Sequence, residues 1–294
     1  MANCRTIFQF FQVLSFLRFA QVVALADKDT EQYLRKENMP HIWCPGCGNG
    51  ILMHDVIRAI HSLGLNRDRV CIVSGIGCSS RAAGYMNFST VHTTHGRAIP
   101  FATGVKLADP TLEVIVITGD GDLAAIGGNH FIHACRRNIG LTVVVFNNEI
   151  YGMTGGQYSP TTPTGDHAAT APYGNLERSF DIVSLAKAAG AGFAARGDCY
   201  HTELTVSLIA SGIKHQGFSV IDCASICPTY YGRKNGNVSP VDMLRWQRDN
   251  LKPVKCGEQF DGYSIGAAFE NEYPEYTQIY EKLLHSLAEG GNET

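Results

Sequence analysis

Two polar segments, each closing an apolar run, carry the residues best suited to chemistry. Gly119-Asp120-Gly121-Asp122 follows the run 114–118, and Asn147-Asn148-Glu149-Ile150 follows the run 141–146. In a parallel sheet the ends of successive strands meet at one edge, so a carboxylate and a carboxamide can converge there on one hard cation. Glycines beside the carboxylate let a phosphate approach the backbone. The two segments therefore predict a site for a cation and a phosphate group.

A strand–helix–strand unit must position these segments. The stretch 127–138 between them is predicted to form a helix with Phe131, Ile132 and Ala134 on one face. The alternative is an ordinary turn with glycines and a polar Asn pair. The spacing, the strand context and the Asn pair together favour the ligand site.

The pair of segments resembles the thiamine diphosphate motif. The resemblance implies that magnesium is held by the carboxylate of Asp120, the side-chain oxygen of Asn148 and the backbone carbonyl of Ile150. It also implies further contacts to the cofactor. The expected cofactor-binding residues are Gly77, Cys78, Ser79, Gly119, Asp120, Gly121, Asp122, Asn148, Ile150, Gly152, Met153 and Thr154.

The ten cysteines are not arranged like a disulfide framework. The chain is long, and Cys71, Cys135 and Cys223 lie inside apolar runs, where a cysteine behaves as a small buried hydrophobe. The segment Cys44-Pro45-Gly46-Cys47 is different. Proline and glycine between the thiols predict a tight turn that lets both sulfurs face one metal centre.

Two further cysteines follow predicted strands. Cys78 comes after the strand 70–74, and Cys227 comes after the strand 218–223. The spacing of these thiols leaves three possibilities open. They are a redox-active dithiol, a structural zinc site, and an iron–sulfur cluster held by one close pair and two distant thiolates.

Six motifs resemble, in order, those of the β subunits of the 2-oxoacid:ferredoxin oxidoreductases, over residues 35–255. They are Trp43-Cys44-Pro45-Gly46-Cys47-Gly48, Gly75-Ile76-Gly77-Cys78-Ser79, His95-Gly96-Arg97-Ala98, Gly119-Asp120-Gly121-Asp122, Tyr151-Gly152-Met153-Thr154-Gly155-Gly156-Gln157 and Cys227-Pro228-Thr229. The resemblance implies one 4Fe-4S cluster. The implied ligands are Cys44, Cys47, Cys78 and Cys227, with Cys223 as the rival for the last position.

The resemblance also implies an activity. Thiamine diphosphate supports decarboxylation of a 2-oxoacid, electrons pass through the cluster to ferredoxin, and coenzyme A takes the acyl group. The expected catalytic or substrate-binding residues are Arg81, His95 and Arg97, because an arginine can hold a carboxylate with two parallel hydrogen bonds. The segment 151–165, rich in Gly, Thr and Pro, is expected to be exposed and adaptable. Its sequence favours 2-oxoglutarate, with pyruvate or a branched-chain oxoacid as alternatives.

The fold predicted is one α/β domain with a mainly parallel sheet, helices on both faces and a thiamine diphosphate-binding architecture. It should span residues 35–294 and include a less regular C-terminal extension. Helices are expected at 51–63, 204–215, 241–250 and 274–287. Ser239-Pro240 supplies an N-cap and a first-turn proline. Residues 1–34 form an N-terminal extension that is expected to be helical.

Composition excludes some classes of protein. The formal net charge is −3 without a basic stripe, which argues against nucleic-acid binding. No run of eighteen apolar residues predicts a membrane span. Ala24-Leu25-Ala26 resembles a signal-peptidase site, but polar residues interrupt the preceding apolar stretch throughout. The interpretation favoured is a cytoplasmic protein whose first helix packs on the body or on a partner.

A component expected of thiamine enzymes is absent from the sequence. The glutamate that activates the aminopyrimidine ring comes from a second domain, and 294 residues leave no room for one. The resemblance supplies it on an α subunit, in a dimer of αβ heterodimers that binds coenzyme A and ferredoxin. Two alternatives stay open: a non-redox thiamine decarboxylase subunit whose cysteines bind zinc or nothing, and a catalytically inactive assembly subunit.

Overall fold

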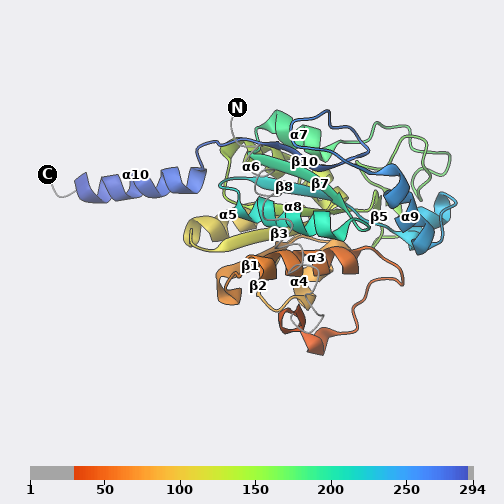
Figure 1. The fold of residues 1–294 in the computed structure, drawn as a ribbon, viewed down its shortest axis with the longest axis horizontal. Helices are drawn as coiled ribbons and strands as arrows, with labels where there is room; N and C mark the ends of the chain where they lie inside the picture. Colours follow the sequence, from red (N-terminus) through yellow and green to blue (C-terminus); the bar gives the residue numbers. More distant parts are fainter. Residues whose placement is uncertain (1–29, 291–294) are drawn as a thin grey trace.

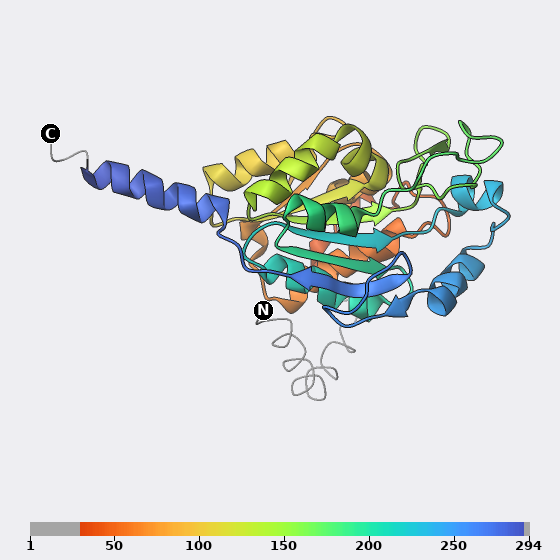
Figure 2. The same cartoon turned by 90° about the horizontal axis from the view of Figure 1, so that it is seen from above.

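Residues 30–290 are described by a computed structural model, drawn in Figures 1 and 2. Eight strands form one sheet in the order β2-β1-β3-β4-β8-β7-β10-β9, and β5 and β6 form a separate hairpin. Neighbours in the sheet run parallel except β7 and β10. The strands are β1 (Val70–Ser74), β2 (Ser89–His92), β3 (Glu113–Gly119), β4 (Thr142–Asn147), β5 (Ile150–Tyr151), β6 (Gln157–Tyr158), β7 (Phe193–Asp198), β8 (Ser219–Ala224), β9 (Lys252–Pro253) and β10 (Ser264–Glu270).

Helices cover both faces of the sheet because successive side chains of its central strands point to opposite faces and both sets are apolar. In β3, Ile115 and Ile117 pack on one face with α3 and α8, whereas Val114 and Val116 pack on the other with α5, α6 and α7. The α-helices are α3 (Asn49–Ser62), α4 (Ala82–Tyr85), α5 (Ala98–Ala108), α6 (Gly128–Arg137), α7 (Ile182–Ala189), α8 (Thr202–Lys214), α9 (Pro240–Asn250) and α10 (Tyr276–Gly290).

Short turns of other helix types connect these elements. Two of them are single π-helical turns: η5 begins at Asp122, and η6 follows Cys227. The short helices are η1 (Glu31–Tyr33), η2 (Lys36–Asn38), η3 (Arg67–Arg69), η4 (Ser79–Arg81), η5 (Asp122–Ile126) and η6 (Pro228–Gly232). The π turn η5 was not predicted, and it lets the chain leave β3 with a carboxylate on each side of Gly121.

The predicted strands and helices are confirmed to within about two residues. The predicted strands 70–74, 114–118, 141–146 and 218–223 correspond to β1, β3, β4 and β8. The predicted cap of α9 is also present, because the Ser239 hydroxyl accepts a hydrogen bond from the amide of Asp242 and Pro240 begins the helix.

One detail of the predicted helix 127–138 is wrong. Phe131 and Ala134 are buried, but Ile132 is 40% exposed. Consecutive residues of an α-helix lie about 100° apart, so Ile132 points away from the sheet and Cys135 fills the buried face instead. The C-terminal part is also more regular than expected, since β10 joins the main sheet antiparallel to β7.

Helix α10 projects away from the body, as Figures 1 and 2 show from two directions. The loops around β5, β6 and α9 lie at the opposite end of the molecule. Residues 1–29, most of the extension predicted to be helical, lie outside the described residues. Within residues 30–290 no helix is both long and apolar enough to cross a bilayer.

Candidate functional site

Three oxygen-bearing groups converge where β3 and β4 end. The Asp120 side chain is 2% exposed and directly follows β3. One terminal atom of the Asn148 carboxamide lies 3.2 Å from Asp120 Oδ1 and 2.7 Å from the carbonyl oxygen of Ile150. With its oxygen there, its separations from these two oxygens are near the roughly 3.0 Å expected between neighbouring ligands of an octahedral cation with bonds of about 2.1 Å. With its nitrogen there, the carboxamide donates to both oxygens.

The surroundings of Asp120 are polar and buried. Burial raises the pKa of Asp120 to about 6, and hydrogen bonds from Ser159 and Thr161 oppose that rise. Ser159, Thr161 and Thr162 are all buried. The prediction that 151–165 is an exposed segment is therefore wrong for residues 159–162, which pack against Asp120 through Thr161, whereas Thr164 and Gly165 are exposed. The buried residues here are a serine and two threonines, so no pattern of apolar residues in the sequence marks their burial.

Glu149, between Asn148 and Ile150, has an unusual backbone conformation. Glu149 has φ +59°, in the left-handed region, which directs its side chain away from the cation oxygens. Burial raises the pKa of Glu149 to about 8, opposed by the neighbouring Tyr231 hydroxyl. That hydroxyl donates its one hydrogen to Asp166. Glu149 is thus tied to the segment after Cys227, as expected for a motif residue that does not ligate the cation.

The four singled-out cysteines lie on three loops that meet. The Cys47 amide donates to the Cys44 carbonyl at 3.0 Å and Gly46 has φ +78°, which confirms the predicted tight turn. The Trp43 indole N–H donates to the Cys78 carbonyl at 2.6 Å. A β-carbon built on Gly152 would lie 3.5 Å from the Cys78 sulfur and 3.8 Å from the Cys227 sulfur. The hairpin glycine therefore faces two of the thiols at once.

The thiols influence one another electrostatically. Burial raises the pKa of Cys47 to about 12, and Cys227, Cys78 and Cys44 raise it further. Burial likewise raises the pKa of Cys78 to about 11, with Cys227 and Cys44 adding to the effect and Arg81 opposing it. Neighbouring thiolates repel one another, so these cysteines need a bound cation to be deprotonated together.

Cys223 is separate from this group. It lies in β8 with its sulfur near the Ile221 carbonyl, and the charges that act on it come from Asp222, Asp55, Cys199 and Asp198. Eight cysteines of the described residues are free thiols. Among these residues, no three His, Cys, Asp or Glu side chains are close enough together to hold a single metal ion.

Asp122, the second carboxylate of the motif, makes only protein contacts. Its Oδ1 accepts from His95 Nδ1 at 2.5 Å and from the Gly96 amide at 2.7 Å, and its Oδ2 accepts from Thr118 at 2.8 Å. A carboxylate only accepts, so Nδ1 of His95 carries a proton and Nε2 is the ring nitrogen left for other partners. Asp122 also occupies the space that a side chain at Gly75 would need.

Comparisons with known proteins show the family of this chain. A family model described as the C-terminal thiamine pyrophosphate-binding domain of thiamine pyrophosphate enzymes matches residues 75–223. The 2-oxoglutarate synthase subunit KorB of Methanocaldococcus jannaschii is 50% identical over 262 residues, which cover 87% of this chain and 97% of that protein. The chain belongs to the β-subunit family of the 2-oxoacid:ferredoxin oxidoreductases. The same-named subunit of Archaeoglobus fulgidus is 48% identical, covering 89% of this chain and 96% of that one.

A solved structure has the same fold as this β subunit. It is the 2-oxoglutarate:ferredoxin oxidoreductase from Magnetococcus marinus with 2-oxoglutarate, coenzyme A and succinyl-CoA bound. The TM-score is 0.79 at 32% identity, and the match covers 88% of this chain and 90% of that one.

The other predicted site residues of the β subunit fall into two groups. Gly77, Ser79, Gly119 and Gly121 lie after β1 or at the end of β3. Gly77 has φ +139° with open space beside it, so a phosphate can approach its backbone. A β-carbon on Gly119 would lie 3.1 Å from the Ser79 hydroxyl, and the Tyr151 ring fills the space beside Gly121.

The second group lies toward the surface. Arg81 is exposed, one residue after the buried Ser80. The Arg97 guanidinium is bound to the carbonyls of Gly96 and Ile126, at 3.2 and 3.3 Å, so part of its donor capacity is used within the β subunit. Met153 and Thr154 form the exposed tip of the β5–β6 hairpin.

Proposed function

We propose that this chain is the β subunit of a 2-oxoglutarate:ferredoxin oxidoreductase that contains thiamine diphosphate, magnesium and one 4Fe-4S cluster. The observation that carries the proposal is the convergence of Asp120, Asn148 and Ile150. When the Asn148 oxygen faces the other two oxygens, no hydrogen-bond donor lies between them. Magnesium suits that set, since it takes few protein oxygens and completes its shell with phosphates and water.

The cysteines are assigned to the cluster on their geometry. Tetrahedral zinc with Zn–S bonds of about 2.3 Å needs sulfurs about 3.8 Å apart. The described residues contain no such compact group, yet Cys44, Cys47, Cys78 and Cys227 affect one another's charge. Thiols gathered more loosely around one centre support a multi-iron cluster. The same reasoning favours Cys227 over Cys223 as the fourth ligand.

Bound thiamine diphosphate would supply the carbanion chemistry of oxoacid decarboxylation. The chain's own groups would bind and orient. Asp120, Asn148 and Ile150 would hold the cation, and the open backbone at Gly77 and Gly119 would admit the diphosphate. His95, fixed by Asp122, would offer Nε2 as a proton acceptor at the edge of the site, where its side chain is 35% exposed. Arg81 would pair with a carboxylate of the substrate.

The assignment of 2-oxoglutarate rests on the relatives. Those at 50% and 48% identity are named 2-oxoglutarate synthase subunits, and the solved neighbour holds 2-oxoglutarate, coenzyme A and succinyl-CoA. Pyruvate and branched-chain oxoacids lack the distal carboxylate. We therefore expect Arg81→Leu to raise KM for 2-oxoglutarate about tenfold or more while changing KM for pyruvate little. Equal effects on the KM of both substrates would show that Arg81 does not bind the distal carboxylate.

An α subunit would complete the site. The β-subunit family assignment implies such a partner, which would bring the glutamate for the aminopyrimidine ring, and we propose a dimer of αβ heterodimers in the cytoplasm with ferredoxin as electron acceptor.

The test is anaerobic purification of the αβ complex, with metal analysis and electron paramagnetic resonance after adding 2-oxoglutarate, with and without coenzyme A. About four irons per β chain, and a reduced-cluster or radical signal that responds to 2-oxoglutarate, are expected. Zinc in place of iron, or a cluster silent to every oxoacid, would instead favour a non-redox thiamine decarboxylase.

A further inference from the structure

The two carboxylate oxygens of Asp120 have different partners. Oδ1 faces the Asn148 carboxamide at 3.2 Å, on the side of the three converging oxygens. Oδ2 accepts a hydrogen bond from the Thr161 hydroxyl at 2.8 Å. A carboxylate can rotate about its Cβ–Cγ bond, so a donor on one oxygen determines where the other one points. Thr161 is buried and comes from the segment after β6, far from Asp120 in sequence.

The Thr161 hydroxyl is itself closely confined. Besides Asp120, its Oγ1 lies 2.9 Å from the Asn147 Oδ1 and 3.1 Å from the Ser159 hydroxyl. A hydroxyl has one hydrogen to donate, and the carboxylate is the stronger acceptor. The Thr161 hydroxyl therefore donates mainly to Asp120, with Asn147 Oδ1 as the second, weaker acceptor within reach.

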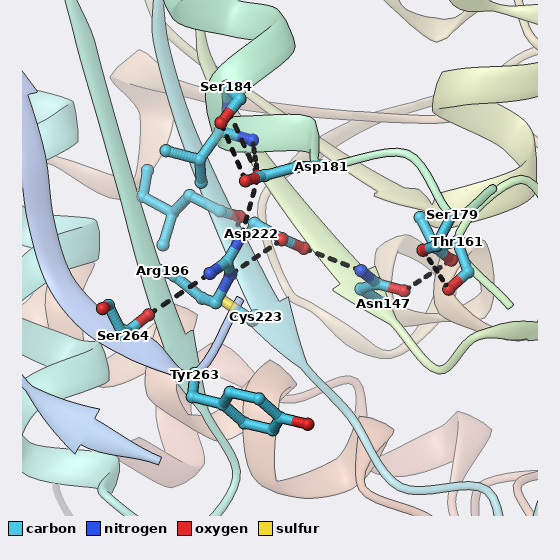
Figure 3. Close-up of polar contacts among 12 residues, drawn as sticks. Asn147, Thr161, Ser179, Asp181, Ser184, Arg196, Asp222, Cys223, Tyr263 and Ser264 are labelled. Carbon is cyan, nitrogen blue, oxygen red and sulfur yellow. Dashed lines mark hydrogen bonds and ion pairs between the residues drawn. The ribbon is translucent and has the colours of Figure 1, made fainter. Parts of the chain in front are cut away.

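A buried chain fixes the direction of Asn147, the neighbour that the sequence motif left without a role. Its Nδ2 donates to Asp222 Oδ1 at 3.0 Å, and Asp222 Oδ2 accepts from Arg196 Nε at 3.3 Å. Figure 3 shows this chain running from β7 through β8 to the end of β4. Because the amide nitrogen is held by Asp222, the carboxamide oxygen of Asn147 must face Thr161.

Arg196 is anchored from three other sides. Its Nη2 donates to Asp181 at 2.8 Å, and its Nη1 donates to the carbonyls of Asp261 and Ser264 at 2.7 and 3.4 Å. The guanidinium also lies over the Phe260 ring. A charged group with this many fixed partners is a rigid base for the chain that ends at Thr161.

We propose that Thr161 is a positioning residue for the cation site, whose hydroxyl donates to Asp120 Oδ2 so that Oδ1 faces Asn148 and Ile150, while Arg196, Asp222 and Asn147 fix one wall of the pocket in which that hydroxyl lies. This inference rests on the proposed magnesium site. Partners of metal-ligating side chains commonly change metal affinity by about 10–100-fold when removed.

The experiment measures binding of Mn²⁺ to the anaerobically purified αβ complex in the presence of thiamine diphosphate. Mn²⁺ shares the oxygen preference of Mg²⁺ and its free form is counted by electron paramagnetic resonance. We expect Thr161→Val, which keeps the shape and removes the hydroxyl, to weaken Mn²⁺ binding about 10–100-fold. Thr161→Ser keeps the hydroxyl and should stay within about threefold of the wild type.

Ser179 provides a matched control. Its hydroxyl donates to the backbone carbonyl of Thr161 at 2.8 Å, so Ser179→Ala removes a neighbouring hydrogen bond without touching the Thr161 hydroxyl. Mn²⁺ affinity should stay unchanged in this variant. If Ser179→Ala weakens binding as much as Thr161→Val does, local packing accounts for the effect and the inference is overturned. Should Thr161→Val fail to assemble, Thr161→Ala, which also removes the hydroxyl and is expected to weaken Mn²⁺ binding about tenfold or more, makes the same test.

Asp120→Ala separates this inference from the proposed function. If Asp120→Ala abolishes Mn²⁺ binding and Thr161→Val binds like the wild type, only the role of Thr161 is wrong. If Asp120→Ala itself binds Mn²⁺ normally, the cation site is elsewhere and both proposals are overturned.

Discussion

Cys78 and Cys227 approach the same small residue, Gly152, from the ends of two different strands. Their sulfurs lie 3.5 and 3.8 Å from the position of a β-carbon on that glycine. One thiol follows β1 and the other follows β8, and β3 and β4 lie between these strands in the sheet. A β-carbon at position 152 would be in van der Waals contact with both sulfurs, so a larger side chain there would compete with the two thiols for space.

The two cysteines at the end of β8 give a matched pair of variants. Both are buried, but only Cys227 faces the other thiols. Cys227→Ser should therefore lower the iron content of the anaerobically purified complex to well below four per chain, and Cys223→Ser should leave it unchanged. Iron analysis and the visible absorption of the cluster check this. Retention of all iron in Cys227→Ser would assign the fourth ligand elsewhere.

Asp122 and His95 should act as one unit. Asp122→Asn replaces an acceptor by a group that can donate, so His95 loses the partner that keeps the proton on Nδ1. We expect kcat to fall about 10–100-fold, with His95→Gln falling similarly and the double variant no lower than the worse single one. Steady-state kinetics with saturating cofactors check this. Multiplicative losses in the double variant would show that the two residues act independently.

Much of the fold was predictable because its signals are local. The apolar runs of β1, β3, β4 and β8 and the glycine-flanked Asp120 are continuous in sequence, so strands, sheet edge and cation ligands could be inferred together. Thr161 could not, because its burial depends on a loop folding back over β3. The opposite orientations of Asp120 and Asp122 were also hidden, since a π turn rather than an α turn follows β3.

Arg196 should be a major contributor to stability. Arg196→Met leaves Asp222 buried without its charged partner, which costs about 3–5 kcal/mol. Adding Asp222→Asn should recover part of the loss, because the unpaired charge is then removed. Thermal unfolding of the wild type, the single variant and the double variant checks this, with an expected fall in Tm of roughly 10 °C for the single variant. A single variant as stable as the wild type would contradict the role of the pair.

Asp55 should make stability depend on pH. Burial raises its pKa from 3.8 to about 8, opposed by Arg58 and reinforced by Glu203. The folded chain then binds a proton that the unfolded chain releases between about pH 4 and pH 8, so stability falls as the pH rises through that range. Asp55→Asn should remove this dependence and raise the free energy of unfolding at pH 8 by about 1–3 kcal/mol.

The control for Asp55 is Glu31→Gln, at an exposed carboxylate paired with Lys36. Its Tm should follow the wild-type curve between pH 5 and pH 8. If the Tm of Asp55→Asn changes with pH as steeply as that of the wild type, Asp55 is ionised in the folded chain and takes up no proton on folding.

The carboxylate of Asp122 has a consequence for how the two proposed cofactors relate. It binds the amide of Ile76, in the loop that carries Cys78, and it belongs to the loop that carries Asp120. A single side chain therefore shares its hydrogen bonds between both loops. If the cluster and the diphosphate bind at these loops as proposed, any effect of one on the affinity of the other is reciprocal and equal in size. Loss of the cluster in air would then change retention of the diphosphate by the same factor by which loss of the diphosphate changes retention of the cluster.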